Sequence, residues 1–257
     1  MEAWIELGRG PLFRIAFSLM LLGLARIVIL TVIGVLQAYR RNPDQIVNWR
    51  EVRHKTLAWL FPANRLWRQR PVYSTVSYLF HAGLIVVPVF LSAHILLWKR
   101  GVGITWPALP QRWANDFTLL AILAGLALWG GRLRSAEARR ISRRQDYLWP
   151  LLLVVPFATG YACANFAISA RAYEWLMLFH VYSADLVFLL IPFTKIAHCV
   201  LAPLSQVVTA VAWKFPAGAG DRVVATLGYA DRPAWLKDSR LHAPLAREEG
   251  AEEAVAK

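Results

Sequence analysis

One stretch of the sequence, residues 174–204 (EWLMLFHVYSADLVFLLIPFTKIAHCVLAPL), constrains the fold more than any other. It is nearly all apolar and longer than the roughly 20 residues that a helix needs to cross a bilayer. Two histidines, His180 and His198, lie within it. In a continuous α-helix their spacing is about five turns, so both imidazoles leave the same face about 27 Å apart. Ionisable side chains inside a membrane span are usually functional, and neutral imidazoles there are suited to axial ligation of haem iron.

The composition agrees with a membrane protein. The chain has 257 residues, 57% of them hydrophobic, and a mean hydropathy of +0.41. The formal net charge is +13, but most Lys and Arg residues lie in short loops between apolar blocks, as in membrane proteins. We therefore expect no nucleic-acid binding. Cys163 and Cys199 lie inside apolar blocks, without a CxxC or CxxCH motif, which argues against disulfides and covalently attached haem.

Five apolar blocks predict an all-α integral membrane protein with five transmembrane helices. The blocks are residues 12–39, 74–98, 113–131, 147–169 and 174–204. Helices two to five are expected to form a haem-binding bundle. Residues 1–205 would make up this membrane domain, and residues 206–257 a cytoplasmic tail that is amphipathic at first and disordered at its end.

The charges of the loops predict the orientation. The first and third loops carry eight and six basic residues, whereas the second carries three and the fourth carries one. The positive-inside rule then places the N-terminus outside and the C-terminus in the cytoplasm. The N-terminus lacks a basic n-region and a small-residue cleavage site, so the first block is expected to be retained.

Two further histidines, His81 and His94, lie in the second block. Blocks two and five run in opposite directions, and each histidine lies about 6–10 Å in from the end of its span. His81 and His198 should therefore lie near the cytoplasmic face, and His94 and His180 near the outer face. This arrangement predicts two non-covalent b haems, held by the pairs His81–His198 and His94–His180. The alternative is four structural histidines bonded to hydroxyls or carbonyls; zinc is disfavoured because no short ligand spacing is present.

The spacing within the second block does not fit an ideal helix. His81 and His94 are thirteen residues apart, which leaves their side chains about 140° apart around the axis. Pro88 lies between them and removes a helical hydrogen bond. We expect a kink or a local π-turn at Pro88 to re-phase the upper half of the helix.

Three charged residues within the spans have two interpretations each. Arg26 lies close to the middle of the first block and either pairs with a haem propionate or makes a snorkelling or helix–helix contact. Lys195, three residues before His198, either pairs with a propionate of the inner haem or snorkels to the interface. Asp185 either pairs with a residue such as Arg26 or relays protons from quinol.

Two motifs resemble a known family. The order of the spans, LFHAG in the second block and IPFTKIAHCVLAP in the fifth are similar to the gamma subunit of respiratory nitrate reductase. They also resemble the related b-type cytochrome subunits of heterodisulfide-reductase-like complexes. The likeness covers about residues 12–205. The His81–His94 spacing is wider than in the nitrate reductase pattern.

The resemblance implies two b haems on spans two and five, with quinol or menaquinol as substrate near the outer haem. It also implies a cytoplasmic iron–sulfur partner beside the inner haem and a location in a bacterial inner membrane. The chain would then be an electron-transfer subunit of a respiratory oxidoreductase complex rather than a free-standing enzyme. One alternative is a haem conduit to a periplasmic multihaem cytochrome c, without a quinone site of its own. Another is a haem-free membrane anchor or transporter whose histidines handle protons or metal.

Overall fold

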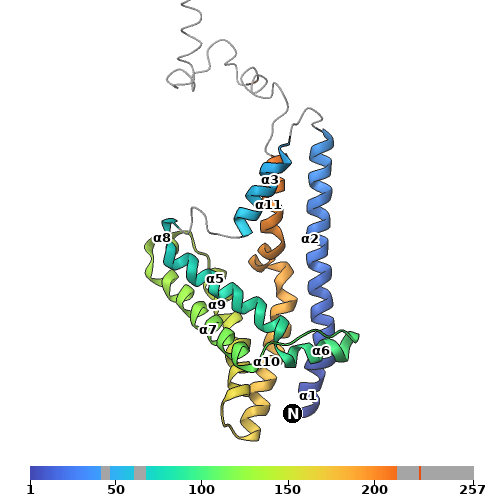
Figure 1. Cartoon of the computed structure of the whole chain (residues 1–257), viewed down its shortest axis with the longest axis vertical. Coiled ribbons are helices and arrows are strands. Elements are labelled where there is room, and N and C mark those ends of the chain that lie inside the picture. Colours follow the sequence, from blue (N-terminus) through green and yellow to red (C-terminus); the bar gives the residue numbers. More distant parts are fainter. Residues whose placement is uncertain (42–46, 61–67, 213–225, 227–257) are drawn as a thin grey trace, which may run out of the picture.

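The computed structural model describes residues 1–41, 47–60, 68–212 and 226 (Figure 1). The regular structure of these residues is helical, without strands. Five helical segments are long and apolar enough to cross a membrane: Glu2–Arg40, Pro71–Phe90, Gln111–Arg134, Arg144–Asn165 and Ala170–Phe193. The prediction of an all-α protein with five membrane spans is confirmed. The predicted disordered tail lies outside the described residues, apart from residue 226 and the helical residues 206–212.

The first span is built from three consecutive helical pieces. It begins with α1 (Glu2–Leu7), passes through the π-helical turn η1 (Gly8–Leu12) and continues as α2 (Phe13–Arg41). Pro11 lies inside η1, where a wider turn accommodates a residue that has no N–H to donate. The span therefore starts about ten residues earlier than the sequence pattern predicts.

The spans pack in the order α5, α7, α9, α10 and α2. Helix α5 (Pro71–Phe90) packs along α7 (Gln111–Arg134), and α7 packs along α9 (Arg144–Asn165). The backbones of α5 and α7 come close because Gly83 has no side chain. A Cβ atom at this position would lie 2.7 Å from Ala121 Cβ and 2.8 Å from the Phe117 carbonyl oxygen.

A second group of helices forms around α2. Helix α10 (Ala170–Leu190) joins the two groups by packing on both α9 and α2. Helix α11 (His198–Ala212) then packs on α2 and on α3 (Trp49–Leu60). Figure 1 shows α11 following α2, whereas α5, α7 and α9 lead away toward the short helix α8 (Ala136–Ile141).

The second apolar block forms two helices. Helix α5 ends at Phe90, Leu91 is extended (φ −71°, ψ 129°), and α6 (Ser92–Val102) follows in a different direction (Figure 1). The prediction of one span over residues 74–98, kinked at Pro88, is therefore wrong in its second half, because the chain breaks three residues after the proline.

The break at Leu91 is possible because other groups bind the carbonyl oxygens that end α5. Trp106 Nε1 donates to the Val89 carbonyl (2.9 Å), and the Leu109 N–H donates to the Phe90 carbonyl (2.9 Å). Both donors belong to the loop that follows α6. In a membrane, where water does not reach these carbonyls, such partners permit a helix to end.

The fifth apolar block is also interrupted. Two 3-10 turns, η2 (Ile191–Phe193) and η3 (Lys195–Ala197), separate α10 from α11. Thr194 between them is extended (φ −133°, ψ 179°). Pro192, which donates no hydrogen bond, lies against Gly23 of α2, where an added Cβ would be 2.6 Å from the proline ring. The prediction of one continuous helix over residues 174–204 is wrong, and His180 and His198 lie on different helices.

Candidate paired-histidine site

The structure brings the four histidines of the second and fifth apolar blocks together as two pairs. His81 on α5 faces His198, the first residue of α11, with ring centroids 5.9 Å apart and ring planes at 82°. His94 on α6 faces His180 on α10, with centroids 6.1 Å apart and nearly parallel planes at 7°. These are the same pairs that the depths of the residues predict.

The separation within each pair suits one metal atom between the rings. Two imidazoles on opposite sides of an iron, with M–N bonds of about 2.0 Å and about 1.1 Å from nitrogen to ring centre, have centroids about 6.2 Å apart. The observed separations of 5.9 and 6.1 Å lie within a few tenths of an ångström of this value.

In the His81–His198 pair, the Nδ1 atom of each ring is bound to a main-chain carbonyl. His81 Nδ1 lies 2.7 Å from the Ser77 carbonyl oxygen, and His198 Nδ1 lies 2.7 Å from the Lys195 carbonyl oxygen. A carbonyl oxygen only accepts hydrogen bonds, so Nδ1 must carry the hydrogen. The Nε2 atoms then keep their lone pairs, which is the tautomer of a metal ligand.

The second pair has the same arrangement, with partners on other helices for both rings. His180 Nδ1 lies 2.7 Å from the Pro156 carbonyl oxygen on α9. His94 Nδ1 lies 3.3 Å from the Val87 carbonyl oxygen on α5. The break at Leu91 lets α6 turn back, so that His94 reaches a carbonyl of the preceding helix. This break, rather than a kink at Pro88, resolves the thirteen-residue spacing.

A glycine makes room for the His180 ring. A Cβ atom on Gly160 of α9 would lie 2.8 Å from His180 Cε1 and 3.0 Å from His180 Nδ1. The absent side chain lets the imidazole reach the Pro156 carbonyl one turn earlier on the same helix. Gly160 cannot be recognised from the sequence as part of a site, because it meets His180 only once α9 and α10 pack.

The two pairs differ in exposure. His94 and His180 are half-buried, whereas His81 and His198 are exposed. A flat ligand can therefore reach the His81–His198 pair from the side of the bundle.

The ligand set is limited to two side chains per pair. No cluster of three or more His, Cys, Asp or Glu residues that could hold a metal ion occurs within residues 1–41, 47–60 and 68–212. A structural zinc site needs four ligands. A haem supplies four nitrogens itself and needs only two opposed axial ligands, so its chemistry fits the histidine pairs.

Arg26 and Lys195 both lie at the level of the His81–His198 pair. Arg26 is exposed on α2, between Gly23, which packs on Pro192, and Leu30, which lines a groove with Leu201 of α11. The Nζ atom of Lys195 lies 2.5 Å from Asp146 Oδ1. Contact of either cation with a propionate remains a prediction.

Asp185 does not pair with Arg26. The aspartate is only 5% exposed, and its Oδ2 atom has no hydrogen-bond partner in the described part of the chain. The predicted Asp185–Arg26 pairing is therefore not formed.

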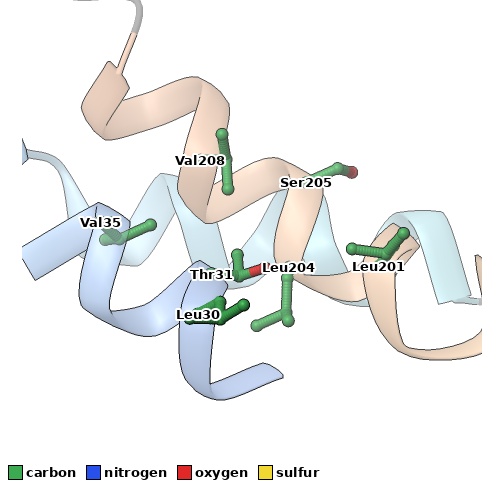
Figure 2. A pocket seen from close by; sticks show the side chains of 8 residues that line it. Leu30, Thr31, Val35, Leu201, Leu204, Ser205 and Val208 are labelled. Carbon is green, nitrogen blue, oxygen red and sulfur yellow. The ribbon is translucent and has the colours of Figure 1, made fainter. Parts of the chain in front are cut away.

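A groove of about 440 Å³ runs between α2 and α11, beyond His198 (Figure 2). It is lined by Leu30, Thr31, Gly34, Val35, Leu201, Leu204, Ser205 and Val208. Its two hydroxyl groups each donate to a carbonyl of their own helix, Thr31 to Ile27 (2.8 Å) and Ser205 to Ala202 (2.6 Å). The groove thus suits an apolar chain and offers no free hydroxyl hydrogen to a polar head group.

Comparison with known proteins gives a relative without a stated function. The chain is 31% identical over 151 residues to a protein of Nitratidesulfovibrio vulgaris (strain Hildenborough) that carries only the name "Protein". The match covers 58% of this chain and 66% of the relative, slightly less than two thirds of its length. No protein-family model matches the chain, and no solved structure matches it.

The carbonyl contacts predict the tautomer of each paired histidine. In ¹⁵N NMR spectra of histidine-labelled, haem-depleted protein in bilayers at neutral pH, all four should be protonated at Nδ1 and unprotonated at Nε2. Free histidine prefers the opposite tautomer, and the exposed His54, assigned through His54→Ala, should follow that preference. An Nε2-protonated ring in either pair would contradict the arrangement.

Proposed function

We propose that this chain is a membrane di-haem cytochrome b, the electron-transfer subunit of a respiratory oxidoreductase complex. The observation that carries this proposal is the combination of opposed rings at 5.9 and 6.1 Å with a carbonyl on every Nδ1 atom. Structural histidines need the hydrogen bonds but not a second imidazole at this distance. Iron ligation needs both.

Under this proposal, His81 and His198 hold one haem, and His94 and His180 hold the other. Each haem supplies one-electron chemistry when bound. The residues of the chain fix the ligand tautomer, hold the opposed ring pairs and surround them with apolar helices. Arg26, which is exposed on α2, would meet a propionate beside the His81–His198 pair, whereas the head group of Lys195 is already engaged by Asp146.

The proposal extends to quinol and to a soluble partner through the resemblance to nitrate reductase gamma-type cytochromes. Quinol or menaquinol would react near the His94–His180 pair, and an iron–sulfur subunit would bind near the His81–His198 pair. The distribution of Lys and Arg supports a cytoplasmic position for the latter pair in a bacterial inner membrane. The exposure of His81 and His198 supports close approach of a partner at that end.

The first test is haem content and assignment by mutation. Purified wild-type protein should contain two haems per chain with a reducible b-type spectrum. The ferric signals should be distinguishable by EPR, because parallel imidazole planes separate the iron d orbitals more than perpendicular planes do. The nearly parallel pair at 7° should therefore give the less anisotropic signal, and the pair at 82° the more anisotropic one.

Removal of one histidine should remove one signal. His94→Ala should abolish the less anisotropic signal, and His81→Ala should abolish the more anisotropic one. His54→Ala, which removes an exposed histidine on α3, serves as the control and should leave both signals unchanged. A colourless wild-type protein from haem-replete cells would refute the proposal, and two haems retained in His94→Ala would refute the pairing.

Gly160→Ala should weaken the haem held by His94 and His180 and leave the other haem in place. The new methyl group would overlap the His180 ring and move it away from the Pro156 carbonyl. Loss of such a ligand-orienting contact typically lowers metal affinity by roughly tenfold or more. Haem titration of the variant measures this change. Gly130→Ala on α7, where an added Cβ has no neighbour within 4 Å, should bind both haems as the wild type does.

A quinol assay separates the proposed function from a haem conduit without a quinone site. Wild-type protein in vesicles should be reduced by a menaquinol analogue, and His94→Ala should lose this reduction while dithionite still reduces its remaining haem. If menaquinol does not reduce a wild-type protein that contains both haems, the quinone step is excluded and the conduit to a cytochrome c is favoured.

A further inference from the structure

We infer that Asp146 is a positioning residue for His198, acting through Lys195. This inference rests on the proposed function, because it assigns a residue outside the ligand set that holds the His81–His198 haem site in its geometry. It gives the Lys195 ammonium group a role other than contact with a propionate.

Asp146 collects three contacts at the start of α9. Its Oδ2 atom accepts a hydrogen bond from the Arg143 N–H (2.8 Å), which fixes the carboxylate at the N-terminus of α9. Its Oδ1 atom accepts a hydrogen bond from Lys195 Nζ (2.5 Å) and lies 3.7 Å from Arg132 Nη1. The side chain of Asp146 is only 11% exposed. The Lys195 side chain is 49% exposed, and pairs at such positions stabilise a structure mainly when several charges form a network, as Asp146, Arg132 and Lys195 do.

Lys195 connects this carboxylate to the ring of His198. Its side chain binds Asp146, and its carbonyl oxygen accepts the hydrogen bond from His198 Nδ1 (2.7 Å). Lys195 begins the short turn η3, which lies between the extended residue Thr194 and α11. The His198 N–H also donates to this carbonyl, so the turn itself orients the ring, but no continuous helix leads from α10 into the turn to fix where it lies. The ion pair with Asp146 supplies the missing restraint.

The same ion pair connects the helix group that carries His81 with the segment that carries His198. His81 belongs to α5, which packs along α7, and α7 packs along α9. Arg132 is on α7 and Asp146 is on α9, and Arg132 and Lys195 both contact the Asp146 carboxylate. This carboxylate therefore links the group to the segment that carries His198. Figure 1 shows α11 leading away from α7 and α9 toward α2. The Asp146–Lys195 contact thus acts where the two helix groups separate.

The test uses variants of Asp146 and Lys195 with one control variant, and it reads each haem separately. Asp146→Asn removes the charge with little change in shape, and Lys195→Met removes its partner, which is half exposed. The double variant completes a mutant cycle. Glu137→Gln, an exposed carboxylate of α8 that binds Ser135, is the matched control. The readouts are haem affinity and the two ferric EPR signals.

We expect Asp146→Asn and Lys195→Met each to lower the affinity for the His81–His198 haem by roughly tenfold and to alter its highly anisotropic signal. The signal of the His94–His180 haem should not change. The double variant should be no worse than either single variant, because both remove one contact. Asp146→Glu should restore much of the affinity, and Glu137→Gln should match the wild type.

Other results would overturn the inference in recognisable ways. An Asp146→Asn protein with both signals and affinities unchanged would show that the carboxylate does not position His198. If Lys195→Met alone changed the haem, or if the two effects were additive, Lys195 would act on the haem without Asp146. If Asp146→Asn fails to fold, the haem affinities of Lys195→Met and Lys195→Arg are compared instead. Only the arginine can keep the ion pair with Asp146, so equal losses in both variants would overturn the inference. A wild-type protein without haem would instead refute the proposed function.

Discussion

Each paired imidazole gives its Nδ1 hydrogen to a main-chain carbonyl, and this single interaction determines what the four rings can do. Inside a membrane no water is at hand to accept that hydrogen, and an unsatisfied ring N–H would cost several kcal/mol. Carbonyl oxygens have a second lone pair even within a helix, so Ser77 can accept from the His81 ring one turn later. Once the Nδ1 hydrogen is bound, the polar atom left on each ring is Nε2. This atom carries a lone pair that can bind a metal.

The helix breaks at Leu91 and Thr194 follow from the same constraint. Ending a helix in an apolar medium exposes carbonyl groups, so a break persists only where other donors reach them. At Leu91 these donors are the Trp106 indole and the Leu109 N–H, and the His94 ring binds the nearby Val87 carbonyl. At Thr194 the hydroxyl of that residue donates to the Ile191 carbonyl (3.4 Å), and the Ala197 N–H donates to the Thr194 carbonyl (3.1 Å). Each break therefore places a histidine within one turn after it.

The sequence predicts the five spans and the histidine pairs because both depend on positions along the chain and not on which way a side chain points around its helix. Apolar length identifies a span, and depth from its end identifies the partner of each histidine, whatever the rotation of the helix. The sequence pattern does not determine how far each helix is rotated about its own axis. The break at Leu91 depends on Trp106 and Leu109, which approach α5 only after α6 has turned back. Gly160 and His180 belong to different helices, and Asp146 and Lys195 are 49 positions apart. Hydrophobic periodicity does not predict such contacts between residues on different helices.

The two pairs are supported in different ways, which bears on how each can work. His94 on α6 and His180 on α10 take their carbonyl partners from α5 and α9, so the packing of four helices fixes both half-buried rings. His81 and His198 are exposed, and each ring binds a carbonyl three or four residues before it. Local bonds orient each ring but do not set the distance between α5 and α11. That distance must come from contacts between the helix groups, such as Asp146–Lys195, or from a bound group that bridges the rings. The exposed pair is thus the more adjustable one, and its rings are open to approach from outside the helices.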